Sequence, residues 1–365
     1  MRIGRSKTAI CSLAMLLGAI PTAWGGAAGA VALRDLASQC AIWVGPAVAY
    51  GPLLGEPPYA DTLGREFSIL TPENDMKWAP IHPQQFVYSF DRADALVSFA
   101  ANNGMTVHGH TFVWHNQVPT WLSSGSFTRD EMIDILRDHI YTVAGRYAGS
   151  IAAWDVVNEA VNDDGSLRNT LWLSRIGSEY LDLAFQFAGD ADPNANLVYN
   201  DYGAEVINAK SNGIYDLLSG LLSRGVPIHG VGFQLHITTG GIDLQSFAQN
   251  MQRFADLGLA LYITELDVRM QLPVTPERLA AQANVYAGIL NACLAQPACK
   301  AFQMWGFTDA HSWVPSFFPG FGAALIFDEM YQPKPAYDAL AQGLGQCATA
   351  TANSGFRAKW SATAH

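Results

Sequence analysis

Residues 128–158, TRDEMIDILRDHIYTVAGRYAGSIAAWDVVN, contain the pattern that decides the fold. Apolar side chains recur at helical spacing from Arg129 to Tyr147, after a threonine that is suited to capping a helix. The short apolar run Ala153 to Asn158 follows, and a run of this kind is typical of a strand that is buried on both faces. The stretch therefore predicts a long helix that leads into a buried strand.

The same alternation of helical and strand patterns repeats along most of the chain. Further strands are predicted at Ala41 to Val44, Phe67 to Thr71, Thr106 to His110, Asn196 to Asn200, Gly230 to Gln234, Ala260 to Glu265 and Ala301 to Trp305. Further helices are predicted at Arg92 to Asn102, Glu179 to Ala188, Lys210 to Ser223, Leu244 to Leu257 and Pro276 to Leu294. Eight such strands predict an α/β fold, a (β/α)8 TIM barrel in a single domain. An open doubly wound sheet is the alternative, but no glycine-rich phosphate loop follows an early strand.

The first 30 residues have the pattern of a secretory signal peptide. Three basic residues precede an apolar run from Thr8 to Ile20, and small residues follow through Ala30. Cleavage after Gly25 and cleavage after Ala30 both fit, and an uncleaved anchor is the alternative. The run is shorter than the roughly 18 apolar residues that span a bilayer. We expect a secreted protein, extracellular or periplasmic, without a membrane contact after cleavage, with a catalytic domain at 31–347 and a disordered tail at 348–365.

Charge and cysteine content narrow the class further. The formal net charge is -11 and no cluster of Lys and Arg occurs after the leader, which argues against nucleic acid and anionic membranes as partners. Of five cysteines, Cys11 lies in the leader, and four remain for disulfides in an exported chain. Three pairings are possible; the short loop between them favours Cys293 with Cys299, which leaves Cys40 with Cys347. Free thiols are the alternative. No zinc-site spacing occurs, and we predict neither a metal nor a cofactor.

Polar and aromatic residues gather where the predicted strands end, which is where a barrel of this type forms its active site. They are Glu73, Asn74, Lys77, His110, Trp114, His115, Gln117, Asp155, Asn158, Glu159, Asn200, Asp201, Tyr202, Gln234, His236, Glu265, Asp267, Trp305 and Trp313.

Glu159 and Glu265 are the predicted catalytic pair, because each ends an apolar strand. Hydrolysis of a glycosidic bond requires one carboxyl to protonate the leaving oxygen and a second to attack the anomeric carbon or to activate water. A buried carboxylate without such a task is costly, although a structural ion pair is the alternative. His236 is expected to donate to Glu265 and to be fixed by Asp267. Asn158 is expected to bind a sugar hydroxyl, and the Trp residues to cover flat sugar faces.

Six segments, taken in order, resemble the signatures of glycoside hydrolase family 10. They are TPENDMKW at 71–78, HGHTFVWH at 108–115, WDVVNE at 154–159, NDY at 200–202, ITELD at 263–267 and WGFTD at 305–309. The segments LIFD at 325–328 and PKPAY at 333–337 are similar as well, so the resemblance covers about residues 33–346.

The resemblance implies a retaining endo-β-1,4-xylanase with Glu159 as acid/base and Glu265 as nucleophile. It also implies that Asp155 and His110 support Glu159, and that the Cys293–Cys299 bridge is present. It implies substrate binding by Glu73, Asn74, Lys77, Trp114, Gln117, Asn158, Tyr202, Gln234, Trp305 and Trp313.

Three positions depart from the family pattern: His108 where Arg is commoner, Gly203 where Asn is commoner, and His311 where an aromatic residue often stands. They bear on subsite preference. A β-1,4-glucanase or a mixed xylanase and cellulase is the alternative enzyme, and a non-catalytic carbohydrate-binding barrel is the alternative of another class. We expect xylan or xylo-oligosaccharides as the partner, and a monomer.

Overall fold

The computed structural model describes residues 31–353, so the predicted leader at 1–30 lies outside the described residues. In the compact unit that begins at Ala32, eight parallel strands form a closed ring. They are β1 (Trp43–Val48), β2 (Ile69–Pro72), β3 (Thr106–Val113), β4 (Ala153–Asn158), β5 (Asn196–Asp201), β6 (Gly230–Phe233), β8 (Ala260–Gln271) and β9 (Cys299–Met304). The ring closes because β9 pairs with both β1 and β8. The predicted TIM barrel is confirmed.

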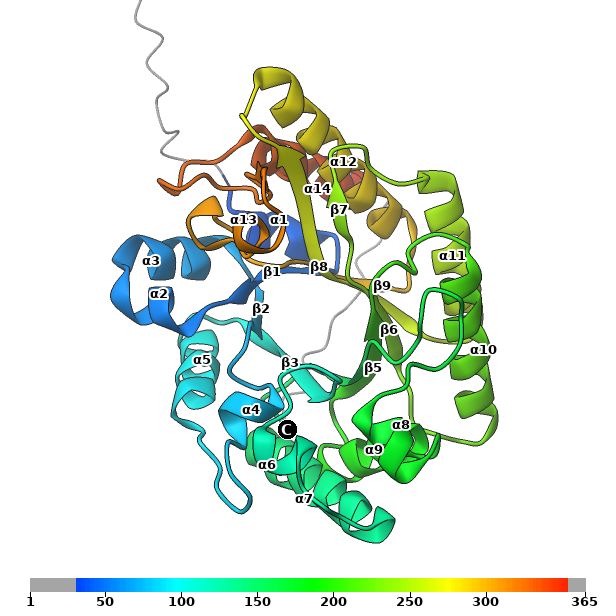
Figure 1. Ribbon diagram of the computed structural model, residues 1–365. Helices are drawn as coiled ribbons and strands as arrows, with labels where there is room; N and C mark the ends of the chain where they lie inside the picture. Colours follow the sequence, from blue (N-terminus) through cyan, green and yellow to red (C-terminus); the bar gives the residue numbers. More distant parts are fainter. Residues whose placement is uncertain (1–30, 354–365) are drawn as a thin grey trace, which may run out of the picture. The chain divides into compact units, whose positions relative to one another are not determined.

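Helices surround this ring of strands (Figure 1). The longer ones are α3 (Pro57–Glu66), α5 (Asp91–Asn102), α7 (Arg129–Tyr147), α9 (Tyr180–Ala191), α10 (Ala209–Ser223), α11 (Leu244–Asp256), α12 (Pro276–Ala295) and α14 (Pro335–Asn353). Shorter ones are α1 (Leu33–Gln39), α2 (Tyr50–Gly55), α4 (Trp78–Ile81), α6 (Thr120–Ser123), α8 (Leu171–Ile176), the 3-10 turn η1 (Asp309–His311) and α13 (Val314–Phe317).

The segment that decided the fold forms the predicted elements. Thr128 caps α7 through a capping box with Glu131, in which each side chain binds the other residue's backbone N–H. Leu136 and Ile140 of α7 are fully buried, and all six residues of β4 are buried as well. A strand buried on both faces needs no polar alternation, which explains the apolar run.

Several boundaries differ from the sequence-based prediction. The first strand is Trp43–Val48 rather than Ala41 to Val44, because Ala41 adopts a left-handed conformation (φ 57°) in the turn after α1. Helix α14 extends to Asn353, so the tail predicted to be disordered from residue 348 begins inside a helix. Residues 354–365 lie outside the described part of the chain.

Strand β8 is longer than the other strands of the ring and rises above it. Its upper part pairs with β7 (His236–Thr238) and, in antiparallel orientation, with β10 (Phe321–Gly322). These additions stand at the carboxyl end of the barrel, where the loops that follow the strands gather. Backbone hydrogen bonds to β7 and β10 thus hold the upper part of β8 in place.

Two disulfides join the predicted cysteine pairs. Cys40 after α1 is bonded to Cys347 in α14, with 5.9 Å between their Cα atoms. Cys293 and Cys299 close the short loop between α12 and β9. Among the described residues, no helix combines the length and the apolar character that crossing a membrane requires.

Candidate active site

Two buried glutamates face the same cavity from different strands. Glu265 lies within β8, and Glu159 follows the last residue of β4. Both side chains line a cavity of about 840 Å³ at the carboxyl end of the barrel. Glu159 follows its strand as predicted, whereas β8 continues past Glu265 to Gln271, so the strand end predicted at Glu265 was wrong.

Glu265 is held by two donors. The side-chain amide of Asn200 donates to Oε1 at 2.7 Å, and Nε2 of His236 lies 3.1 Å from Oε2. Nδ1 of His236 lies 2.7 Å from Oδ2 of Asp267, which also accepts from the indole N–H of Trp313 at 2.9 Å. Burial opposes a charged imidazole, but the two carboxylates outweigh it and raise the pKa of His236 to about 10. His236 thus bridges Asp267 and Glu265, as predicted, and its raised pKa favours the protonated ring.

Glu159 has a different environment, made mostly of amides. Nε2 of Gln234 donates to its Oε1 at 3.2 Å, and the Asn158 amide lies beside the same oxygen. Nε2 of His115 is 3.9 Å from Oε2, too far for a hydrogen bond. Burial lowers the pKa of His115, although the Glu159 carboxylate acts against this. Glu159 therefore faces neutral donors, whereas Glu265 faces a cation.

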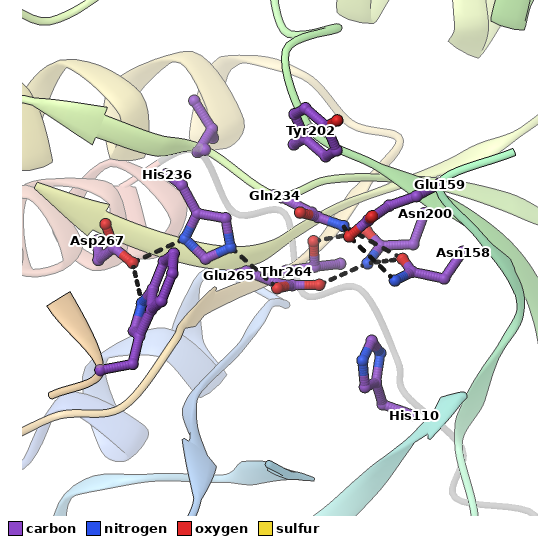
Figure 2. A network of polar contacts seen from close by, with 12 residues as sticks. His110, Asn158, Glu159, Asn200, Tyr202, Gln234, His236, Thr264, Glu265 and Asp267 are labelled. Carbon is purple, nitrogen blue, oxygen red and sulfur yellow. Dashed lines mark hydrogen bonds and ion pairs between the residues drawn. The ribbon is translucent and has the colours of Figure 1, made fainter. Parts of the chain in front are cut away.

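Amide groups connect the two glutamates into one network (Figure 2). Nδ2 of Asn200, which contacts Glu265, is also 3.0 Å from Oδ1 of Asn158. Nε2 of Gln234 is 3.2 Å from both Asn158 and Glu159. Thr264 fixes the orientation of Asn200 by donating to its Oδ1 at 2.8 Å. The carboxyls are thus tied to each other through a short chain of uncharged side chains.

Asp155 lies below the cavity and does not line it. Its two carboxylate oxygens are 2.9 Å from Nε2 of His108 and 2.8 Å from Nδ1 of His110. Burial opposes its ionisation, but the two histidines outweigh it and lower the pKa of Asp155 to about 2. In the described chain neither Asp155 nor His110 is hydrogen-bonded to Glu159, so any support they give is indirect. The His110 ring instead packs at 5.2 Å from that of Trp305.

The cavity gathers nearly all of the predicted binding residues. Besides both glutamates and His236, these are Glu73, Asn74, Lys77, His110, Trp114, Gln117, Asn158, Tyr202, Gln234, Trp305 and Trp313. The predicted residues that stay beneath its surface are Asp155, Asn200, Asp201 and Asp267.

One part of the cavity wall contains the buried lysine Lys77. The ammonium of Lys77 lies 4.9 Å from the ring centre of Trp114 and 5.3 Å from that of Trp305. It donates to Oδ1 of Asn74, which also accepts from the Gln117 amide. Burial lowers the pKa of Lys77, and nearby carboxylates, Glu265 first, act against this. Donors and flat apolar rings together suit a sugar.

The cavity also includes residues that the sequence did not indicate. Its lining adds Asn116, Glu205, Ile237, Phe317 and Phe318. The Phe pair close after Trp313 was an available signal, whereas nothing in the sequence marked Glu205 or Ile237.

Tyr202 lines the same cavity and lies between two cations that were also missed. Nη2 of Arg168 donates to its hydroxyl at 3.0 Å, and the ammonium of Lys210 is 3.5 Å from its ring centre. Lys210 is also 2.9 Å from Asp201. Burial, partly offset by Lys210, raises the pKa of Asp201 to about 6.

Within residues 31–353, no group of three or more His, Cys, Asp or Glu side chains is arranged to hold a metal ion.

The sequence profile of glycosyl hydrolase family 10 matches residues 32–343. The chain belongs to this family. It is 49% identical over 313 residues to endo-1,4-beta-xylanase B of Thermotoga neapolitana, covering 85% of this chain and 90% of that protein. It is 40% identical over 297 residues to the endo-1,4-beta-xylanase of Agaricus bisporus, covering 81% and 89%.

Solved structures agree with this assignment. The crystal structure of xylanase 10B from Thermotoga petrophila RKU-1 in complex with xylobiose is 48% identical to this family 10 hydrolase. It superposes with a TM-score of 0.86, covering 88% of this chain and all of that one.

The three departures from the family pattern have local explanations in this family 10 hydrolase. His108 pairs with Asp155, and its Nδ1 is 2.8 Å from the Gln303 amide. Gly203 adopts a left-handed conformation (φ 67°), which favours glycine. His311 lies 3.1 Å from Oε2 of Glu56. None of the three residues contacts Glu159 or Glu265 in the described chain.

Proposed function

We propose that this glycoside hydrolase is a retaining endo-β-1,4-xylanase that cuts internal bonds of xylan by double displacement. The observation that carries the proposal is the pair Glu159 and Glu265, which face one cavity and are tied by a single amide network. Retention requires the two carboxyl groups to lie about 5–5.5 Å apart.

The two environments suit the two chemical tasks. The Glu265 carboxylate is contacted by the Asn200 amide and by His236, and these contacts hold it in place to attack the anomeric carbon. Glu159 gives its proton to the leaving oxygen and then, as a base, activates the water that releases the sugar. Asn158 and Gln234 stand next to Glu159 and offer amide hydrogen bonds to the sugar hydroxyl groups.

Xylan is the proposed substrate rather than cellulose. The matched relatives are named endo-1,4-beta-xylanases, and one similar structure contains xylobiose. Neutral donors and the rings of Trp114, Trp305 and Trp313 suit an uncharged chain of sugars. The glucanase alternative has no specific observation in its favour. Export as a monomer is part of the proposal; the leader pattern supports the export, and size-exclusion chromatography of the secreted protein tests the oligomeric state.

The test is release of reducing sugar from xylan and from carboxymethylcellulose, measured on the natural protein and on Glu159→Ala and Glu265→Ala. We expect release from xylan that both substitutions reduce by at least about a thousandfold. The anomer that forms first, followed by proton NMR, should be β. A first-formed α product would refute retention, equal release from cellulose would favour the mixed specificity, and no release from either polymer would favour a binding protein.

A further inference from the structure

The backbone at Glu159 has an uncommon conformation for a residue with a side chain. Its φ is 58°, in the left-handed region that glycine and asparagine prefer. Such a conformation persists only where the surroundings impose it. The Glu159 N–H donates to the carbonyl of Asn200 at 2.9 Å, and the Glu159 carbonyl accepts from Nε of Arg168 at 2.8 Å. Arg168 thus holds one of the two backbone groups that orient this side chain.

The loop that carries Arg168 is fixed by backbone hydrogen bonds and by a close contact with α10. It turns back after β4, with a bridge between Val161 and Leu167, and the Arg168 N–H donates to the carbonyl of Ala160 at 2.7 Å. At its tip, Gly165 lies against Gly213 of α10 so closely that a Cβ on Gly213 would be 2.3 Å from the Gly165 oxygen. These contacts hold the loop, and with it the Arg168 guanidinium, in a fixed position next to the Glu159 backbone.

The same guanidinium reaches the cavity wall. Its Nη2 donates to the hydroxyl of Tyr202 at 3.0 Å and to the carbonyl of Val161 at 3.4 Å. Tyr202 lines the same cavity as Glu159. A single side chain therefore connects the main chain of Glu159 to a residue that faces the substrate.

We propose that Arg168 is a positioning residue. It orients the Glu159 carboxyl for proton transfer and aligns it with the sugar that contacts Tyr202. This inference rests on the proposed function. Arg168 does not touch the reacting atoms; it acts by holding the left-handed backbone of Glu159 and by fixing the Tyr202 ring. Its effect is therefore expected in the two steps in which Glu159 transfers a proton, and kcat/KM reports the first of them, the departure of the leaving group.

Substrates that differ in their need for a proton test this role. Phenyl β-xylobioside requires protonation of its leaving group, whereas 2,4-dinitrophenyl β-xylobioside does not. For Arg168→Gln we expect kcat/KM on the phenyl substrate to fall by on the order of tenfold to a hundredfold, a fraction of what general acid catalysis supplies. On the dinitrophenyl substrate we expect a change of less than about twofold. Arg168→Lys should recover part of the loss.

Two further variants make the result interpretable. Tyr202→Phe removes only the hydroxyl that Arg168 binds, and should give a smaller loss with the same dependence on the leaving group. Arg137→Gln removes a guanidinium on the exposed face of α7, where it pairs with Asp134 and Asp138, and should leave both rates unchanged.

Equal losses on the two substrates, or no loss on either, would overturn the role of Arg168. If Arg168→Gln does not fold, the Lys and Tyr202→Phe variants decide by the same comparison. Failure of the natural protein to hydrolyse either xylobioside would instead refute the proposed function.

Discussion

His236 lies between two carboxylates, and this placement fixes its charge over a wide pH range. Its pKa is raised to about 10 from an ordinary value of 6.5, because Asp267 and Glu265 outweigh the cost of burial. Between these two values the folded protein keeps a proton that the unfolded chain has lost. The stabilisation is therefore complete below pH 6.5 and is lost as the pH rises through 10.

The prediction is a melting temperature that declines from about pH 6.5 towards pH 10, and a shallower decline in His236→Asn. Calorimetry at several pH values measures both slopes. His311→Asn is the matched control for loss of a histidine that pairs with a carboxylate, since His311 contacts Glu56 and neither Glu265 nor Asp267. Parallel slopes in all three proteins would contradict the assignment of charge to His236.

At the level of single residues, the sequence indicated the two reacting glutamates better than the side chains that hold them in place. Glu159 and Glu265 stood out because each ends a predicted apolar strand, although β8 continues beyond Glu265, and the family resemblance gave their roles. The contact of Asn200 with Glu265 and that of Arg168 with the Glu159 carbonyl could not be predicted. Such contacts depend on side-chain rotamers and on how a loop folds back, and neither leaves a periodic signal.

The contact between the β4–α8 loop and α10 leads to a prediction at the scale of elements. Gly213→Ala would place a methyl group 2.3 Å from the Gly165 oxygen, so the loop that carries Arg168 must move away. Overpacking of this kind costs about 1–3 kcal/mol of folding stability. We expect xylan hydrolysis to fall together with stability in a urea titration.

Gly220→Ala in the same helix is the control for this prediction. The nearest atom to its new Cβ would be the end of the flexible Arg224 side chain, at 3.5 Å. Alanine should stabilise the helix by up to about 1 kcal/mol and leave activity unchanged. Similar behaviour of the two variants would show that the close contact does not govern the loop.

A stack of rings beneath α4 and α7 predicts sensitivity to acid. Nδ1 of His82 lies 3.2 Å from Nδ1 of His139, and the His139 ring lies 3.5 Å from that of Trp78. Burial lowers the pKa of His82 to about 4 and that of His139 well below 6.5. The unfolded chain takes up these protons near pH 6.5, so stability falls as the pH drops below that value.

The double variant His82→Phe with His139→Phe should keep the stacking and remove this proton uptake. We expect its free energy of unfolding to change less between pH 6.5 and pH 4 than that of the natural protein. Urea titrations at the two pH values measure the difference. An unchanged loss in the double variant would assign the acid sensitivity to other groups.

Element types were predicted well where a pattern was long or fully buried, as for α7 and β4. The first strand was displaced because its Gly45 and Pro46 do not look like strand residues, although both pair with β9. The short helices α1, α2, α4, α6, α8 and α13 were missed, since a single turn or two carries too little periodicity. The longer helices α3 and α14 were missed as well.

The whole barrel is closed where its first and last strands meet. β1 pairs with β9 at this seam, and the Cys40–Cys347 bridge joins α1 to α14 across 307 residues of sequence. A disulfide that closes so long a loop restricts the unfolded chain more than the six-residue separation of Cys293 and Cys299.

Replacing Cys40 and Cys347 by Ala should therefore lower the free energy of unfolding by about 2–5 kcal/mol. The Cys293→Ala with Cys299→Ala variant should lose less. Guanidinium titrations of the two oxidised variants compare them directly. A larger loss from the short bridge would mean that strain or packing, rather than loop closure, determines what each disulfide contributes.

The uncharged side chain of Asn200 contacts Glu265, Asn158 and Thr264 at the same time. This limits which substitutions the enzyme can accept during evolution. Any replacement there breaks several hydrogen bonds at once, so adaptive change has no gradual route through the centre. Phe317, by contrast, is 65% exposed at the edge of the cavity and can be exchanged alone. A saturation library should yield almost no active clones at Asn200 and many at Phe317, where new substrate preferences would arise.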